Sequence, residues 1–429
     1  MKIAGLSVLI FSVILGIVFW SFGSQIFNLS APDQDIELTY WSVDEDERVM
    51  KAIITSYLSS RPKIKINFVK QSRINYRTRL QTQLRAGSGP DIFRFHHSWL
   101  SSFSSDLQPA PTSLISAEEF EKTFYPLVSE RLVVNKRIYG IPLEIDGIAM
   151  LVNTDILKAA AVETPSDWQQ FVVATRKVTV RNTAGQIQTA GAAIGSTSNI
   201  DYWPEILATL FFQQPSTSLG DPAVGGGAEA LTFYTSFILD PRNKVWDTTL
   251  APAAQMFKEG RLAFYFAPYK IAAQIKRENP TLNFGVYAIP QLPGGQISYG
   301  SFWAEGVSSK SLHQKEAWEF LTYLATKPVL EFRANSYAQI GAEIRLSPRI
   351  DMASLYLFDP LATTYIKTAP NFKSWYLNSD VADSGINDEL IAIYKQTVDK
   401  TLQGQESELS LQDISGEVKQ ILSKHQVIE

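Results

Sequence analysis

The stretch YGIPLEIDGIAMLVNTDIL, residues 139–157, is mostly apolar and yet carries Glu144 and Asp146 in its middle. Its run of Ile and Leu predicts a buried strand that leads into a helix. Burying a carboxylate without a partner costs several kcal/mol or more. Both charges therefore need a partner in the protein, or contact with water or a ligand.

The chain before this stretch alternates between two periodicities. Residues 36–43 (IELTYWSV), 63–69 (KIKINFV) and 91–95 (DIFRF) read as strands, and residues 44–60 and 73–86 read as helices. A β-α-β-α-β order of this kind indicates an α/β unit with a largely parallel sheet.

The same alternation restarts after residue 147. In the segment TPSDWQQFVVATRKV, Thr164 is the expected helix cap and Pro165 lies in the expected first turn. Further helices are predicted at 154–161, 202–214, 227–239, 251–260, 313–327, 387–402 and 411–424, and further strands at 147–153, 261–267, 283–290 and 298–311. The chain has 429 residues, more than the roughly 250–300 at which one core usually divides. Two lobes are therefore expected.

Composition excludes several classes of protein. The net charge is −4 with mixed signs, which argues against a nucleic-acid partner. The chain has no cysteine, so it has no disulfide, no thiolate metal site and no lipid-modified cysteine near its N-terminus.

The N-terminus carries the signal for location. Lys2 precedes an apolar run from Ile3 to Trp20, and no acidic residue appears before Asp33. This run is long for a signal-peptide core and short, but sufficient, for a membrane span. Residues 1–23 are thus predicted to be an uncleaved anchor, with a cleaved signal as the alternative, and residues 24–35 a tether. Either reading places the body of the protein outside the cytoplasm.

Metal and nucleophile motifs are missing from the sequence. It has four histidines and neither an HExxH motif nor a G-x-S-x-G elbow. His96 and His97 are neighbours on an expected strand, so they point to opposite faces. One is expected to face a cleft and the other to pack, and no metal site or cofactor is predicted.

Glu144 and Asp146 could form the acid and base of a glycosidase. Two residues apart on a strand, they lie on one face about 6.6 Å apart, which is too wide for a retaining pair and at the lower edge for an inverting pair. Catalytic carboxylates flank the scissile bond from opposite sides, which neighbours on one strand rarely can. A binding role is therefore favoured over catalysis.

An ordered set of segments resembles bacterial extracellular solute-binding proteins of the maltose-binding class of sugar ABC transporters. These segments are GSGPDIFRFHHSW, IYGIPLEIDGIAMLVNTDILKAA with TPSDWQQF behind it, MFKEGRLAFYFAPYKIAAQI, FGVYAIPQLPG and SKSLHQKEAWEFLTYLATKP. They cover nearly all of residues 36–340. Tyr269 stands where many members of the family have Trp.

The resemblance implies the two-lobe, type II periplasmic-binding-protein fold, in which the lobes close on a solute. Strands would cross between the lobes at 141–148, 288–300 and 345–350. The implied segments are 36–143 and 291–347 for the first lobe, and 144–290 for the second lobe, which a helical region at 348–429 completes.

The same resemblance implies a cleft floored by the first crossing strand, with Glu144 and Asp146 accepting hydrogen bonds from sugar hydroxyls. In the open form, water would be the partner of Asp146. The alternative is that one of the two carboxylates pairs with an arginine of a lobe. Aromatic rings would supply flat apolar faces for the sugar, whereas Trp168 and Trp318 are expected in the core. The remaining candidate ligand-binding residues are Trp41, Asp91, His96, His97, Trp99, Tyr202, Trp203, Tyr269, Trp303 and Trp375.

The implied function is capture of a sugar or oligosaccharide and its delivery to the permease subunits of an ABC transporter, by a monomer that is not an enzyme. Two alternatives stay open. One is a ligand-binding sensor for a signalling partner, and the other is an extracytoplasmic glycoside hydrolase.

Overall fold

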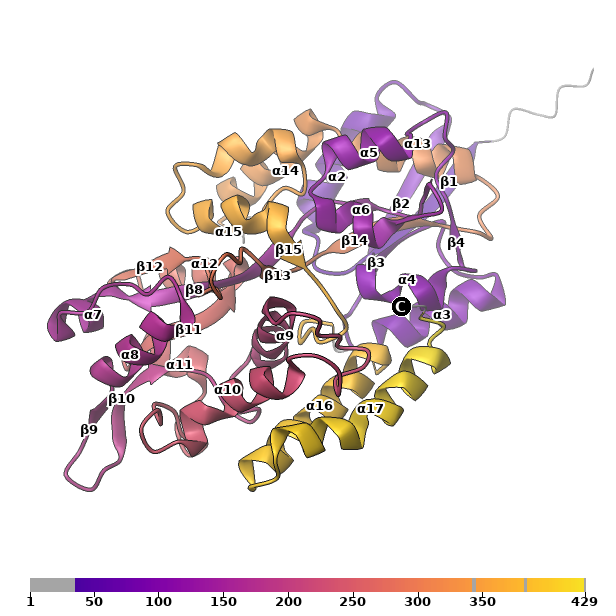
Figure 1. Cartoon of the computed structure of the whole chain (residues 1–429). Coiled ribbons are helices and arrows are strands. Elements are labelled where there is room, and N and C mark those ends of the chain that lie inside the picture. Colours follow the sequence, from indigo (N-terminus) through magenta and orange to yellow (C-terminus); the bar gives the residue numbers. More distant parts are fainter. Residues whose placement is uncertain (1–34, 342–344, 382–383, 428–429) are drawn as a thin grey trace, which may run out of the picture.

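The computed structural model describes residues 35–341, 345–381 and 384–427. Most strands of these residues form two large sheets, each covered by helices, and the sheets lie in two lobes (Figure 1). The expected α/β class is confirmed.

The first sheet is built from the N-terminal repeats. β1 (Ile36–Ser42) pairs in parallel with β2 (Ile64–Lys70) and with β3 (Ile92–His96). Two helices connect these strands, α2 (Glu47–Leu58) and α3 (Tyr76–Ala86). The predicted order of elements is confirmed, and the carboxyl ends of the three parallel strands meet at one edge.

A later strand completes the first sheet. β14 (Trp303–Ser308) runs antiparallel to β3, and also to β4 (Leu107–Gln108) and β7 (Ile141–Pro142). Its first residue, Trp303, pairs with His96, the last residue of β3. The start of β14 therefore lies at the same edge as the carboxyl end of β3.

The second sheet is centred on β8, Asp146–Asn153, which lies in the stretch 139–157. From Gly147 to Asn153 the strand is buried at every position, because it has neighbours in the sheet and helices on its faces. The strand order is β15 (Phe372–Lys373), β13 (Ser298–Ser301), β8, β11 (Leu262–Pro268), β10 (Ile187–Ala192) and β9 (Val180–Arg181), with β12 (Phe284–Tyr287) also paired to β8.

The chain passes between the two sheets close to residues 142–146, where β7 ends and β8 begins. The second crossing lies between Ser301 and Trp303. The range predicted for it, 288–300, is wrong, because β13 (Ser298–Ser301) still pairs with β8 in the second sheet. A third connecting segment includes Leu346, which forms a bridge with Ile145 of the first.

The start of α8 also differs from the prediction. The helix spans Trp168–Val178, and its cap is Asp167, whose side chain accepts a 2.7 Å hydrogen bond from the backbone N of Gln170. Thr164 and Pro165 lie before the helix. Asp is as good a cap as Thr, and here the Asp stands directly before the first apolar residue of the helix.

Helices α16 (Ile386–Leu402) and α17 (Ser407–Lys424) pack against each other and against α10 (Gly227–Leu239) of the second lobe. Apart from these contacts, the lobe assignment stays a prediction for the four ranges 36–143, 144–290, 291–347 and 348–429. The other helices are α4 (Leu100–Phe103), α5 (Ala117–Thr123), α6 (Pro126–Leu132), α7 (Thr154–Ala160), α9 (Trp203–Gln213), α11 (Ala253–Lys258), α12 (Tyr269–Glu278), α13 (Gln314–Leu324), α14 (Lys327–Gln339) and α15 (Thr363–Thr368).

Within the described ranges, no helix is both long enough and apolar enough to cross a membrane. The predicted anchor, residues 1–23, lies outside those ranges, as does the predicted tether apart from Asp35.

Candidate functional site

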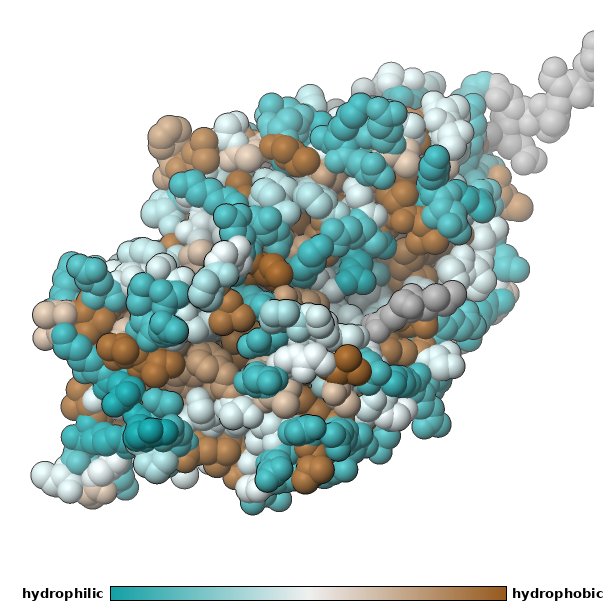
Figure 2. Space-filling model, in the orientation of Figure 1, coloured by the Kyte–Doolittle hydropathy of each residue, from teal (hydrophilic) through white to brown (hydrophobic). Residues whose placement is uncertain are grey.

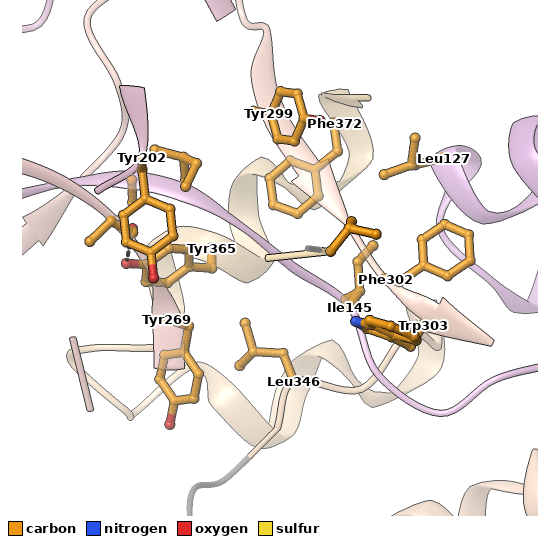
Figure 3. Packing of buried hydrophobic residues seen from close by; sticks show 14 of the residues in the cluster. Leu127, Ile145, Tyr202, Tyr269, Tyr299, Phe302, Trp303, Leu346, Tyr365 and Phe372 are labelled. Atoms are coloured by element: carbon orange, nitrogen blue, oxygen red, sulfur yellow. Dashed lines mark hydrogen bonds between the residues drawn. The ribbon is translucent and has the colours of Figure 1, made fainter. Parts of the chain in front are cut away.

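A polar cavity of about 400 Å³ lies where the crossing segments meet the edges of the two sheets. The close-up view shows Tyr269 of the second lobe and Trp303 of the first on either side of Leu346 (Figure 3). The lining residues are Asp44, Lys70, Arg73, Glu144, Ile145, Asp146, Tyr269, Lys270, Ser301, Phe302, Trp303, Arg345, Leu346 and Asp380.

Glu144 lines this cavity, but its charge is compensated by the protein. Its carboxylate is ion-paired with Arg94, with Arg333 at 3.1 Å and with Arg345 at 2.5 Å. Burial disfavours its charged form, yet these three guanidinium groups outweigh burial and hold the pKa of Glu144 below its usual range. The charge of Glu144 is therefore compensated by arginine side chains, and its hydrogen bond to a sugar hydroxyl stays a prediction.

The arginine partners of Glu144 extend into a buried ionic network in the first lobe. Arg94 lies 2.7 Å from Glu45 and 3.0 Å from Glu305, and Arg333 lies 2.7 Å from Glu45. Burial is again the largest influence on Glu45, but Arg333 and Arg94 lower the pKa of this residue to about 2. Burial raises the pKa of Glu305 to about 7, since Arg94 only partly offsets it.

Asp146 also has protein partners. One carboxylate oxygen accepts hydrogen bonds from the backbone N of Gly147 at 2.8 Å and of Tyr269 at 2.9 Å, and the other accepts from the backbone N of Lys270 at 3.4 Å. Tyr269 and Lys270 are the first residues of α12. The carboxylate of Asp146, at the start of β8, therefore caps this helix. The expectation that water is the partner of Asp146 is therefore wrong, because backbone N–H groups of the protein bind its carboxylate.

Ion pairs line the cavity walls. Arg73 donates from Nε to Asp44 at 2.8 Å, and Lys270 lies 2.5 Å from Asp380. Lys70, the last residue of β2, adds an exposed ammonium group. These walls offer many donors and acceptors while carrying little net charge, which suits a polar neutral solute.

Six lining residues were not predicted from the sequence: Asp44, Lys70, Arg73, Lys270, Arg345 and Asp380. A signal existed for two of them: Asp44 follows β1 and Lys70 ends β2, and ligands of parallel sheets bind at the carboxyl ends of strands. The other four come from loops, from a helix start and from the third crossing segment, where the sequence carries no comparable signal.

Trp303 and Tyr269 are the two predicted aromatic residues that line the cavity. Trp303 is largely buried, and the ring of Trp99 packs against it edge-on at 5.1 Å. The guanidinium of Arg73 lies 5.2 Å from the centroid of the Trp303 ring. A solute would therefore meet Trp303 together with Arg73.

Both histidines of the predicted pair are largely buried, and neither lines the polar cavity. His97 borders a second cavity, described below, and His96 packs, so one of the two faces a cavity as predicted. His96 has its two ring nitrogens 2.7 Å from Ser98 Oγ and 2.8 Å from Ser301 Oγ, and His97 stacks on Phe302. Burial lowers the pKa of both imidazoles, with smaller contributions from nearby cations.

Asp91 lies at the opposite end of β3 from the cavity. It accepts hydrogen bonds from the backbone N of Thr39 at 2.8 Å and from the hydroxyl of Ser311 at 2.5 Å. These contacts tie the start of β3 to β1 and to the end of β14, which is a structural role and not the predicted ligand contact.

The other predicted residues also lie outside the cavity lining. Trp99 is a buried neighbour of Trp303, while Trp41 is a half-buried residue of β1. Tyr202 and Trp203 are buried at the start of α9. None of these four side chains forms part of the cavity wall.

Trp375 lies in a different place. Together with Tyr376 it lines a second cavity, of about 460 Å³, whose other side includes His97 and Arg131. A third cavity, of about 510 Å³, is apolar and lies between α8, α9 and α10, where hydrophobic residues gather on the surface (Figure 2). Trp168 borders this third cavity and is buried, as predicted for a core residue.

In the described part of the chain, His, Asp and Glu side chains form no group of three or more that could hold a metal ion.

The model of the family described as bacterial extracellular solute-binding proteins matches residues 41–330. The chain therefore belongs to the bacterial extracellular solute-binding protein family, and the resemblance predicted from the sequence is confirmed. The family consists of solute-binding proteins of transport systems that act outside the cytoplasm.

Individual relatives are distant. A Brucella abortus (strain 2308) protein described as a binding protein is 25% identical over 354 residues, which cover 79% of this chain and 83% of that protein. The maltooligosaccharide ABC transporter solute-binding lipoprotein of Streptococcus pneumoniae (strain ATCC BAA-255 / R6) is 23% identical over 325 residues, 72% of this chain and 74% of that protein.

A solved structure confirms the two-lobe fold. The sugar-binding protein MalE from Xanthomonas citri superposes with a TM-score of 0.74 at 19% identity, and the match covers 91% of this chain and 98% of that one.

Proposed function

We propose that this protein captures a carbohydrate, most simply an oligosaccharide, in the cavity between its lobes and delivers it to the permease subunits of an ABC transporter. The observation that carries the proposal is the cavity itself, which joins ion-paired polar walls to the rings of Tyr269 and Trp303. The named activities of the Streptococcus pneumoniae and Xanthomonas citri relatives support the same class of solute.

The wall chemistry suits sugar hydroxyls. Each hydroxyl both donates and accepts, so it can bond a carboxylate such as Asp44 and an ammonium such as Lys270 at once. Hydrogen bonds to charged groups are stronger than neutral ones. The aromatic rings offer apolar faces to the C–H side of a sugar ring.

Capture would proceed by lobe closure, because the cavity walls come from both lobes. We expect small-angle scattering to give a smaller radius of gyration when a bound sugar saturates the protein. An unchanged scattering profile at saturation contradicts closure, though not binding.

The ligand class is tested by thermal shift and calorimetry of the purified chain. Maltooligosaccharides of increasing length are compared with a polyol and with a short peptide at the same concentrations. A bound sugar raises the melting temperature, because binding stabilises the folded state by RT ln(1 + [L]/Kd). A shift with the peptide alone overturns the carbohydrate assignment.

The proposal includes three further properties. The protein acts as a monomer, it releases its solute chemically unchanged, and its N-terminal segment anchors it at the outer face of the membrane. Size-exclusion chromatography with light scattering tests the monomeric state. Chromatography of the sugar after long incubation tests whether it is released unchanged. Membrane fractionation of the full chain tests the anchor. A stable oligomer contradicts the first property, and a cleaved sugar contradicts the second. A chain found entirely in the soluble fraction contradicts the third.

A further inference from the structure

A buried carboxyl group lies behind one wall of the cavity. Glu205, in the first turn of α9, is 2% exposed. Its Oε1 accepts hydrogen bonds from the backbone N of Ser379 at 2.6 Å and from the hydroxyl of Ser379 at 2.7 Å. Its Oε2 has no hydrogen-bond partner among the described residues. Burying a carboxyl group with an unpartnered oxygen costs free energy, so packing alone does not account for this residue.

The residue after Ser379 joins the two lobes. The carboxylate of Asp380 pairs with Lys270 of α12 in the second lobe, and its backbone carbonyl accepts a 2.9 Å hydrogen bond from Arg73. Arg73 belongs to the first lobe, where it also binds Asp44. We refer to Arg73, Lys270 and Asp380 as the Asp380 bridge.

All three members of the Asp380 bridge line the cavity. A continuous series of polar contacts therefore runs from Glu205 in the second lobe, through Ser379 and the Asp380 bridge, to Asp44 in the first lobe. The cavity wall at this point is a chain segment between β15 and α16 and belongs to neither element.

We propose that Glu205 is a positioning residue that fixes the Ser379–Asp380 segment, so that the Asp380 bridge closes the cavity and holds the lobes together. This inference rests on the proposed function for its effect on solute binding. An unfixed segment would have to lose conformational freedom each time the lobes closed, which weakens closure and binding. Gln at position 205 keeps the acceptor oxygen for Ser379, whereas Ala removes it.

The first test needs no solute. The sequence contains no cysteine, so two introduced cysteines carry spin labels at defined places. Lys51→Cys on α2 and Val173→Cys on α8 are exposed positions on different lobes. The distance distribution between the labels is measured in the parent, in Glu205→Ala, in Glu205→Gln and in a control variant.

Thr235→Ala is the matched control. Thr235 is a buried residue of α10 in the same lobe, and its hydroxyl bonds to the carbonyl oxygens of Leu231 and Thr232 in its own helix. We expect Glu205→Ala to move population to longer distances, while Glu205→Gln and Thr235→Ala keep the parent distribution. A parent-like distribution in Glu205→Ala, or an equal change in Thr235→Ala, overturns the proposal.

The second test uses maltotriose as the probe in calorimetry. Loss of two hydrogen bonds that order the wall is expected to weaken affinity roughly tenfold in Glu205→Ala. Glu205→Gln and Thr235→Ala should stay near the parent value. Equal affinities for all four proteins contradict the inference. If the parent does not bind maltotriose or any other sugar, the proposed function fails, and the label distances still decide the role of Glu205.

Discussion

Glu144 and Asp146 are two residues apart on one crossing segment, yet each is tied to a different lobe. Glu144 is held by Arg94 of β3, by Arg333 of α14 and by Arg345. Asp146 is held by the first backbone N–H groups of α12, which packs on the second sheet. The two acids in an apolar stretch thus fasten the crossing segment at both ends, one through side-chain cations and one through a helix terminus.

The largest effect is expected from breaking the first attachment. Glu144→Ala leaves buried guanidinium groups without their anionic partner, and removing one partner of a buried ionic network costs about 3–5 kcal/mol. The free energy of unfolding is measured by urea titration at pH 7.

Glu118→Ala on α5 is the control for that measurement, because Glu118 forms an exposed pair with Lys122 in the same lobe. Exposed pairs of this kind contribute little. Equal and small changes in both variants would show that Glu144 is not a structural anchor.

The sequence predicted the longer strands of both sheets except β10 (Ile187–Ala192), because the signal for a strand or a helix is local. The single strand predicted at 298–311 is two strands, β13 and β14, which belong to different sheets. Apolar residues alternate in β1 and run continuously in β8, and the structure has strands at both places. The cap of α8 was misplaced by three residues because Thr164 and Asp167 carry the same capping chemistry.

The candidate site was harder to predict, since its partners are distant along the chain. Arg333 and Arg345 lie about two hundred residues after Glu144, and no spacing rule connects them. The same holds for Asp146 and α12, which are joined only because β8 and β11 are neighbours in the sheet. Sequence patterns find which residues are costly to bury, and tertiary structure decides what compensates them.

Glu205 of the second lobe differs from Glu45 of the first lobe in the direction of its pKa shift. Burial, with a smaller contribution from Asp380, raises the pKa of Glu205 to about 8. The unfolded chain releases this proton near the ordinary value of 4.5, so the contribution of Glu205 to stability is present at acid pH and is lost as the pH rises towards 8.

Glu205→Gln removes this titration. Relative to the parent, the variant should gain roughly 4 kcal/mol of stability between pH 5 and pH 9, given about 1.4 kcal/mol for each unit of pKa difference. Urea unfolding at both pH values gives the change, with Thr235→Ala as a non-titrating control. A pH-independent difference between parent and variant contradicts the raised pKa.

The paired acids of the first lobe should respond in the opposite direction. The pKa of Glu45 is lowered to about 2 from 4.5, so its stabilisation is present above pH 5 and is lost as the pH falls towards 2. The Glu205→Gln variant lacks the opposite pH dependence that comes from Glu205. The free energy of unfolding of this variant should therefore decrease on acidification below pH 5. A flat profile between pH 5 and pH 3 would mean that the network of the first lobe does not depend on ionised Glu45.

A smaller effect is expected at the second attachment. Asp146→Asn keeps one acceptor oxygen for the first N–H groups of α12 but loses the negative charge at the helix N-terminus, which should cost about 1 kcal/mol. Asp167→Asn, at the cap of α8, is the control, because Asn caps a helix as well as Asp does. A variant of Asp146 that melts like the parent and loses sugar affinity would return this residue to a solute-facing role.

The smallest effect on stability is expected at Asp44, which faces the cavity. Its pair with Arg73 is partly exposed, with 24% and 44% of the two side chains accessible, and such pairs contribute less than about 1 kcal/mol. Asp44 has a positive φ of 64°, a conformation that Asn adopts readily, so Asp44→Asn should not strain the backbone. The substitution should instead weaken solute binding, and calorimetry should show a loss of about 1 kcal/mol in the free energy of sugar binding. Glu37→Gln, which breaks an exposed pair with Lys65 outside the cavity lining, should leave affinity unchanged. A change in melting temperature without a change in affinity would place Asp44 with Glu144 among the structural acids, and the cavity would then lose its best acceptor on the first lobe.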